Sequence, residues 1–166
     1  FLFSDTIANN INFAPEPRTR EEIEEAASIA CVHEMIEELP DGYDSDLGER
    51  GVKLSGGQKQ RISIARALVK DPTILVLDDC LSAVDTQTEE MILARLKPFA
   101  ARRTTLIIGH RVSTMQYADR IAVLDKGRLA ELGTHQELIE LGGIYSDIYR
   151  KQQLEEKVRQ EGGGDE

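Results

Sequence analysis

In the first part of the chain, hydrophobic positions at helical spacing begin only after an apolar stretch. An apolar stretch at 1–13 ends near two prolines. Thr19 and Glu22 then have the spacing of a capping box, in which each side chain satisfies a free N–H group at a helix start. The apolar residues of 23–30 repeat at helical intervals, and the turn sequence at 40–42 closes this segment.

The middle of the chain changes from helical to strand-like patterning. Ser55 and Gln58 mark a second helix start, and the apolar positions of 62–69 give that helix one hydrophobic face. The run at 74–77 is short, continuous and apolar, which fits a strand buried on both faces of a parallel sheet. The segment 104–108 predicts a second buried strand.

The last part of the chain predicts a hairpin followed by a terminal helix. Asp85 can cap a helix that continues through the nineties, and Ser113 begins a short one. Residues 121–124 and 128–131 lie on either side of a D-K-G turn, and this arrangement predicts a hairpin. Thr134 and Glu137 form another capping box, and an amphipathic helix follows. The order of elements indicates an α/β core behind a helical subdomain.

The charge balance narrows the possible ligands. The net charge is −10, from 20 basic and 30 acidic residues, which argues against a nucleic-acid-binding face because such faces are basic. It does not exclude a nucleotide, because helix N-termini bind phosphate without net positive charge. No apolar run approaches the length of a membrane span. Cys31 and Cys80 lack metal-ligand spacing, and we interpret them as reduced, buried thiols.

The most informative segment is a helix start with two glycines at 54–61. Glycines lack a Cβ, so an anion can approach the free N–H groups there, and the helix dipole favours negative charge. A tight turn into a helix accounts for Ser-Gly-Gly alone equally well. The full string LSGGQKQR, however, resembles the signature motif of the ABC ATPase superfamily. The resemblance implies that Ser55, Gly56 and Gly57 contact the γ-phosphate of an ATP held by an opposite subunit. It also implies that Leu54, Gln58 and Asp85 belong to the nucleotide-binding residues.

Two aspartates close the first predicted strand. A carboxylate at the carboxyl end of a parallel strand points into the ligand crevice, and Mg²⁺ on phosphates uses one or two carboxylates plus water. Asp78 therefore suits a metal ligand, although it could also cap the next turn, and it resembles the Walker B aspartate of the family.

Asp79 stands where the family usually has a glutamate that acts as general base. Aspartate is one methylene shorter, which removes about 1.5 Å of reach. A base must lie within about 2.6–3.2 Å of the proton that it takes. We therefore expect this site to hydrolyse ATP slowly or not at all.

Two further segments match the family in order. Residues 81–85, which end in Asp85, resemble the D-loop that runs along the dimer interface, although Asp85 is a good helix cap in any protein. His110, after the second strand, resembles the switch histidine that contacts the γ-phosphate. A lone histidine after a strand is more often structural, and we assign structural roles to His33 and His135.

Other features point to the exporter type. The segment 48–51 resembles the exporter-specific loop that touches the transmembrane domains, and 1–7 resembles part of the groove for their coupling helices. No G-x-x-x-x-G-K-[ST] loop occurs, so the resemblance covers only the later part of a nucleotide-binding domain. We interpret Phe1 as a cut end. Without a Walker A strand and helix packed on them, 74–77 and 107–108 should expose apolar surface.

Together these residues predict a partial P-loop-NTPase-like parallel sheet behind a helical signature subdomain. We expect the helical subdomain at 1–72, the α/β part at 73–160 and a disordered tail at 161–166. The resemblance implies an ATPase motor of an ABC exporter at the cytoplasmic face of the cell membrane. It also implies ATP and Mg²⁺ as ligands, and a second nucleotide-binding domain and transmembrane coupling helices as partners. Two alternatives remain: a non-catalytic half of a heterodimeric exporter, and a DNA-repair ABC ATPase.

The missing phosphate loop gives a first prediction. The isolated 166-residue chain should bind ATP weakly and should not turn it over, because no lysine-bearing loop cradles the phosphates. Isothermal calorimetry with and without Mg²⁺ checks this expectation. Tight, Mg²⁺-dependent binding to this chain alone would contradict it.

Overall fold

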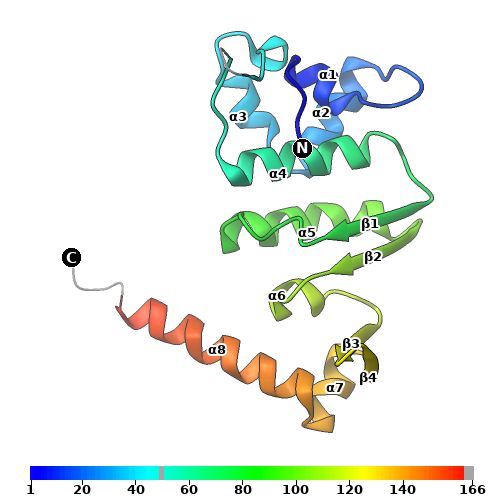
Figure 1. Ribbon diagram of the computed structural model, residues 1–166, viewed down its shortest axis with the longest axis vertical. Helices are drawn as coiled ribbons and strands as arrows, with labels where there is room; N and C mark the ends of the chain where they lie inside the picture. The colour runs from blue at the N-terminus through cyan, green and yellow to red at the C-terminus, as the bar shows by residue number, and fades with distance from the viewer. Residues whose placement is uncertain (49–50, 163–166) are drawn as a thin grey trace. The chain divides into compact units, whose positions relative to one another are not determined.

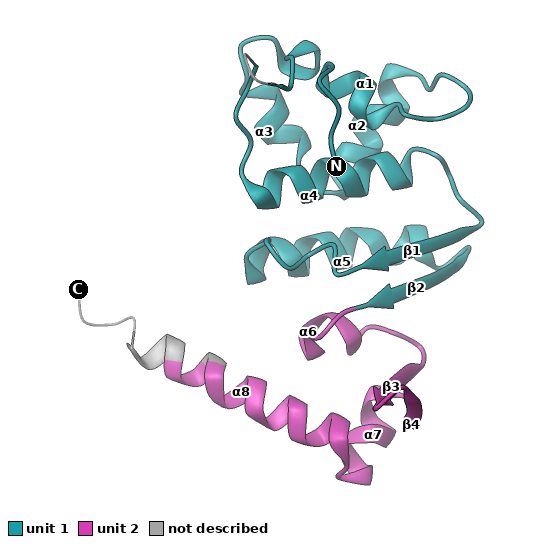
Figure 2. Cartoon of the chain, in the orientation of Figure 1, with its two compact units in different colours: residues 1–108 teal, residues 109–166 magenta. Residues whose placement is uncertain are grey.

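The computed structural model describes residues 1–48 and 51–162. The chain forms two compact units, residues 1–108 and residues 109–166, and each unit is described by itself (Figure 2).

Helices dominate the first unit, and its two strands flank the last of its helices along the chain (Figure 1). Its elements in chain order are α1 (Ile7–Ile11), α2 (Arg20–Ile29), α3 (His33–Glu37), a 3-10 turn (Gly42–Asp44), α4 (Gly56–Leu68), β1 (Ile74–Asp78), α5 (Thr86–Ala100) and β2 (Thr104–Ile108). The second unit contains α6 (Val112–Met115), β3 (Ile121–Asp125), β4 (Arg128–Gly133), α7 (His135–Leu141) and α8 (Ile144–Gly162).

The long helices begin at the predicted caps. Complete capping boxes precede α2, α4 and α7, and their capping residues are Thr19, Ser55 and Thr134. Asp85 caps α5 by accepting a hydrogen bond from the Thr88 N–H group at 2.9 Å. These predictions are confirmed, because a cap depends only on residues three positions apart.

The predicted helical segment up to 40–42 is broken in the structure. Helix α2 ends at Ile29, and Cys31 adopts a left-handed backbone with φ of 53°. The short α3 then starts without a side-chain cap. A second difference is α1, which Thr6 caps inside the apolar stretch 1–13, where no helix was predicted. Both features are too short to produce a clear helical repeat in the sequence.

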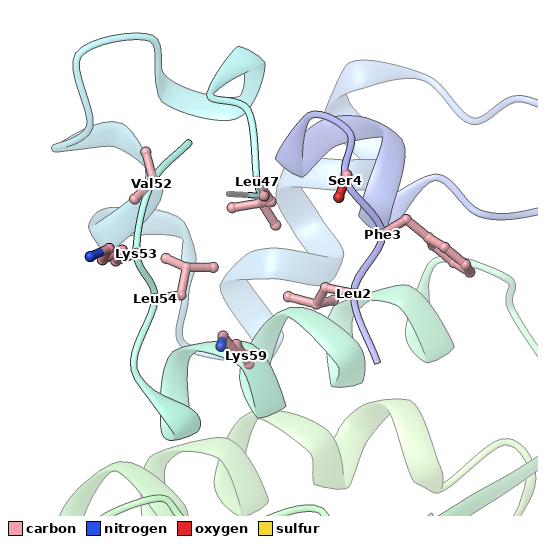
Figure 3. Close-up of a pocket in the computed structure, with 9 residues that line it drawn as sticks. Leu2, Phe3, Ser4, Leu47, Val52, Lys53, Leu54 and Lys59 are labelled. Carbon is pink, nitrogen blue, oxygen red and sulfur yellow. The ribbon is translucent and has the colours of Figure 1, made fainter. Parts of the chain in front are cut away.

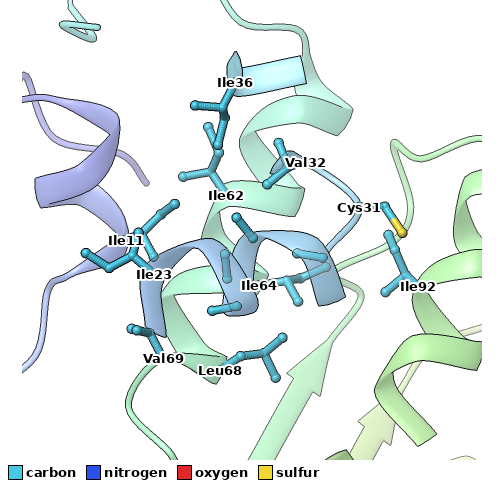
Figure 4. Close-up of a cluster of buried hydrophobic side chains, with 14 of the residues drawn as sticks. Ile11, Ile23, Cys31, Val32, Ile36, Ile62, Ile64, Leu68, Val69 and Ile92 are labelled. Carbon is cyan, nitrogen blue, oxygen red and sulfur yellow. The ribbon is translucent and has the colours of Figure 1, made fainter. Parts of the chain in front are cut away.

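The first unit has one hydrophobic core between its helices and one face of its sheet (Figure 4). Strands β1 and β2 pair in parallel, with Asp78 opposite Ile108. Leu75 and Leu77 are buried, whereas Ile74 is 63% exposed and Val76 is 53% exposed. The prediction of burial on both faces is therefore wrong for this chain. The expected exposure of apolar strand surface is found, except that Ile107 is half-buried against the core.

The second unit packs an antiparallel hairpin against two helices. Strands β3 and β4 form the predicted hairpin, with Ile121 opposite Gly133. Its small core consists of Val112, Ile121, Leu138 and Tyr145. Helix α8 continues through Gly162, so the first two residues of the expected tail are helical, and 163–166 lie outside the described residues. The compact units divide at residue 108. The predicted boundary at 72, between a helical subdomain and an α/β part, is a different kind of division and stays a prediction. Across the described ranges, no helix is long and apolar enough to cross a bilayer.

A buried amide joins the N-terminal segment to α4. Asn10 is 1% exposed, and its Nδ2 donates to the carbonyl oxygens of Phe3, at 3.0 Å, and of two further residues. Its Oδ1 accepts from the Phe3 N–H group and from Arg66 Nη2, each at 2.8 Å. Arg66 Nε also donates to the Asn10 carbonyl at 2.6 Å. Burial lowers the pKa of Arg66. Asn10 therefore fixes the segment that precedes α1 against the helix that begins at the signature motif.

This network gives a stability prediction. Asn10→Ala should lower the free energy of unfolding by about 2–3 kcal/mol, because it leaves buried donors and acceptors unpaired. Asn9→Ala is the matched control, since Asn9 is exposed and should cost less than about 0.5 kcal/mol. Urea denaturation of the chain measures both variants. Equal destabilisation by the two changes would contradict the role given to Asn10.

Candidate functional site

The start of α4 presents backbone N–H groups to solvent. Ser55 Oγ accepts from the Gln58 N–H group at 3.2 Å, and Gln58 Oε1 accepts from the Ser55 N–H group at 2.8 Å. The N–H groups of Gly56 and Gly57 lie in the first turn, where a helix offers no acceptor of its own. The helix dipole adds partial positive charge at this end. Gln58, expected to contact nucleotide, thus uses its carbonyl oxygen to hold the helix start together.

The D-loop segment lies directly against this helix start. A Cβ built on Gly57 would approach the Ala83 carbonyl oxygen to 2.7 Å, which is too close for any side chain. A Cβ on Gly56 would meet the Ala83 side chain at an ordinary 3.5 Å. Glycine therefore has a different effect at each position. Gly57 permits the close approach of the loop, and Gly56 leaves the helix tip open.

Gln60 binds the same loop with both ends of its amide. Its Nε2 donates to Ser82 Oγ at 3.0 Å, and its Oε1 accepts from the Ala83 N–H group at 2.9 Å. Ser82 Oγ in turn donates to the Asp79 carbonyl at 3.0 Å. A chain of hydrogen bonds thus runs from the signature helix to the residue at the general-base position. The role of Gln60 is not visible in the sequence, since its partners lie 22 and 23 positions away.

Asp78 and Asp79 lie at the carboxyl end of β1, and both are exposed. The Asp79 N–H group donates to the Ile108 carbonyl at 2.9 Å, which extends the sheet by one bond. Asp79 has a left-handed backbone with φ of 46°, a conformation that is strained for most side chains but tolerated by aspartate. Burial raises the pKa of the adjacent Cys80 to about 11 and keeps it a neutral thiol.

The carboxylate of Asp85 is engaged locally. The Thr88 N–H group lowers the pKa of Asp85 by hydrogen bonding to its charged form. This supports its role as a helix cap. Contact with a second subunit stays a prediction.

His110 belongs to the second unit. It is exposed, in the loop between β2 and α6. The other two histidines have local tyrosine partners, His33 with Tyr43 and His135 with Tyr145, with a nitrogen-to-oxygen distance of 2.8 Å in each pair. Those contacts support the structural roles expected for them.

A groove of about 490 Å³ opens beside the signature helix (Figure 3). Leu2, Phe3 and Ser4 line one side, and Val52, Lys53 and Leu54 line the other. Lys59 of α4 lies at its base in this view. Leu54 connects the groove to the helix start, because it lines the groove and directly precedes Ser55. The expected exporter loop at 48–51 falls partly on residues 49–50, which lie outside the described residues.

The residues present fit a magnesium nucleotide better than a metal held by protein alone. Within 1–48 and 51–162, no group of three or more His, Cys, Asp or Glu side chains is arranged to hold a metal ion. Mg²⁺ on phosphates needs only one or two carboxylates with waters. Asp78, exposed at the strand end, meets that requirement.

Known proteins resemble this chain closely. The family described as "ABC transporter" matches residues 4–82. An uncharacterized ABC transporter ATP-binding protein of Bacillus subtilis, YknU, is 53% identical over 95% of this chain and 27% of its own length. The ATP-dependent lipid A-core flippase of Shewanella oneidensis is 53% identical over 91% of this chain and 25% of its own length.

A solved structure gives the same result for the fold. The structure of a bacterial Atm1-family ABC exporter with ATP bound matches 91% of this chain and 27% of its own, with a TM-score of 0.85 and 48% identity. The helical subdomain and parallel strands are thus those of an ABC exporter's ATP-binding domain. The chain belongs to the ABC transporter ATP-binding family. It spans about a quarter of the length of the curated relatives it matches.

The contact between Gly57 and the D-loop gives a matched pair of variants. Gly57→Ala should lower the free energy of unfolding by about 1–3 kcal/mol, because the loop carbonyl must move away from the new Cβ. Gly56→Ala should be neutral, or stabilising by up to about 1 kcal/mol, since alanine favours a helix over glycine. Urea denaturation of both variants measures the difference. Equal values for the two would show that the loop does not approach Gly57 as described.

Proposed function

We propose that this chain is part of the ATP-binding and ATP-hydrolysing motor of an ABC exporter, and that it powers transport by ATP-driven pairing with a second nucleotide-binding domain. The observation that carries the proposal is the start of α4, where exposed N–H groups are held against the D-loop by Gly57 and Gln60. Helix starts of this kind bind anions, and the family relationship indicates which anion. The relatives named as ATP-dependent or ATP-binding support it.

In the proposed mechanism, Ser55, Gly56 and Gly57 bind the terminal phosphate of a nucleotide seated on the opposite domain. The N–H groups and the helix dipole offer a fixed positive field, which needs no reorganisation as charge develops on the phosphate. The D-loop is hydrogen-bonded to Gln60, so this grip and the loop move together. Binding at the signature helix is thereby transmitted to the Asp79 backbone through Ser82.

The chain's own nucleotide is proposed to lie at the end of β1. Asp78 would hold Mg²⁺, which when bound neutralises charge on the phosphates. Asp79 is proposed to act as base on an attacking water, and His110 is proposed to contact the γ-phosphate. The shorter reach of Asp79 limits proton transfer.

The groove beside the signature helix is proposed to receive the coupling helices of a transmembrane domain. Its apolar residues suit the side chains of an inserted helix, and Lys53 and Lys59 can pair with acidic groups at its rim. A helix seated there would press on Leu54 and so on Ser55. We propose that the motor therefore lies at the cytoplasmic face of the membrane. The exporter relatives support a membrane location, and the face is part of the proposal.

A second candidate function is the non-catalytic half of a heterodimeric exporter. The short carboxylate at Asp79 favours it, because this half would bind nucleotide and complete the partner's site with its own intact signature motif. A DNA-repair ABC ATPase receives no such support, since none of the relatives described above belongs to that class.

ATP turnover by the assembled full-length transporter tests the proposal. The wild-type assembly should hydrolyse ATP, and Asp79→Glu should raise turnover at least about tenfold if reach limits the base, since general base catalysis contributes about 10²–10⁴-fold. Asp79→Asn keeps the length of the side chain and removes the charge, so it is the matched control and should lower turnover below that of the wild type, because the proposed base is lost.

The outcomes separate the candidates. A full-length assembly without ATP hydrolysis would overturn the motor function. Turnover that is lost in Asp79→Asn and unaltered in Asp79→Glu would show that aspartate is a competent base, which removes the argument for a degenerate site.

A further inference from the structure

The loop that carries His110 is held by a side chain from the terminal helix. Gln152 of α8 donates from Nε2 to the His110 carbonyl at 2.7 Å. Its Oε1 accepts from the Val112 N–H group at 2.8 Å. One amide thus binds the backbone on both sides of Arg111, in the way that a paired strand would. The two contacts join positions 42 and 40 apart in the sequence.

The Gln152 contact supplies what α6 lacks. Helix α6 has Arg111 at its N-cap position, and no side-chain hydrogen bond caps it. Val112, the first residue of α6, is 4% exposed, so its N–H group has little access to water. A helix start without a cap is an unstable boundary for a loop. Gln152 satisfies that N–H group from outside and thereby fixes where the loop ends.

Helix α8 is itself anchored at its first turn. The Glu131 carboxylate on β4 accepts from the N–H groups of Ile144 at 2.5 Å and Tyr145 at 3.1 Å. Tyr145 is 3% exposed and pairs with His135. Tyr145, Tyr149 and Gln152 follow each other at helical spacing, so they share one face of α8. That face packs on the other elements of the second unit through Tyr145 and Tyr149, and Gln152 is its polar member.

We propose that Gln152 is a positioning residue for His110. The proposal rests on the proposed function, in which His110 contacts the γ-phosphate. Holding the His110 carbonyl and the Val112 N–H group fixes the backbone from which the imidazole projects. A displacement of about 1 Å at a reacting group can cost about a hundredfold in rate, so this backbone position matters for turnover. The terminal helix then has a catalytic purpose in addition to its packing role.

The test compares four variants of the assembled full-length transporter. Gln152→Ala removes both hydrogen bonds, and Gln152→Glu keeps an acceptor for Val112 but turns a carboxylate oxygen toward the His110 carbonyl. Gln153→Ala is the matched control, because Gln153 is the exposed neighbour on the same helix. His110→Ala gives the effect of losing the imidazole. The kcat and KM for ATP, the Tm and the hydrogen exchange of residues 109–116 are measured for each variant.

We expect both Gln152 variants to lower kcat about tenfold, with KM changed less than about twofold, because misplacement affects the transition state more than binding. Exchange of the 109–116 amides should quicken in Gln152→Ala, and its Tm should fall, because the Val112 N–H group loses its acceptor. A kcat loss that disappears when each variant is assayed at the same interval below its own Tm would make Gln152 merely structural and overturn the proposal. If Gln152→Ala turns over ATP like the wild type while His110→Ala is impaired, the inference about Gln152 is overturned and the proposed role of His110 stands. Unimpaired His110→Ala would overturn both this inference and the proposed role of His110.

Discussion

The close approach of the Ala83 carbonyl to Gly57 is the constraint on which the candidate site depends. It brings the D-loop against the signature helix with no room for a side chain, and Gln60 fixes the register with two hydrogen bonds. Because Ser82 also binds the Asp79 carbonyl, hydrogen bonds link the N-terminal tip of α4 to the carboxylate end of β1. Movement at either place is therefore passed to the other through short, directional bonds rather than through deformable packing.

Neutral amides position several loops and helix starts in this chain. Asn10, Gln58, Gln60 and Gln152 each hold backbone groups. An amide offers a donor and an acceptor on one planar group, so it can bind both polarities of a loop. It also adds no charge near groups that must meet phosphate or hold a proton. In a chain with net charge −10, such neutral contacts avoid altering the local electrostatics of the site.

The sequence predicted the features that depend on near neighbours. Caps at Thr19, Ser55 and Thr134 were found because their partners lie three residues away. The two strands followed from continuous apolar runs. The break at Cys31 was missed, because a single left-handed residue leaves no periodic signal. The glutamine contacts were missed for another reason: polar residues on a helix look solvent-facing until the distant loop they bind is in place. The signature motif located the site, but not the contacts that hold it.

The left-handed backbone at Asp79 has a consequence for which residues this position accepts. Aspartate is one of the few residues that tolerate such a conformation, whereas a longer side chain there is held against its backbone preference. If this position is the proposed base, a site at which selection for hydrolysis is relaxed would thus gain stability by exchanging glutamate for aspartate. Folding energetics then act against a glutamate here, and retaining one requires selection strong enough to oppose them.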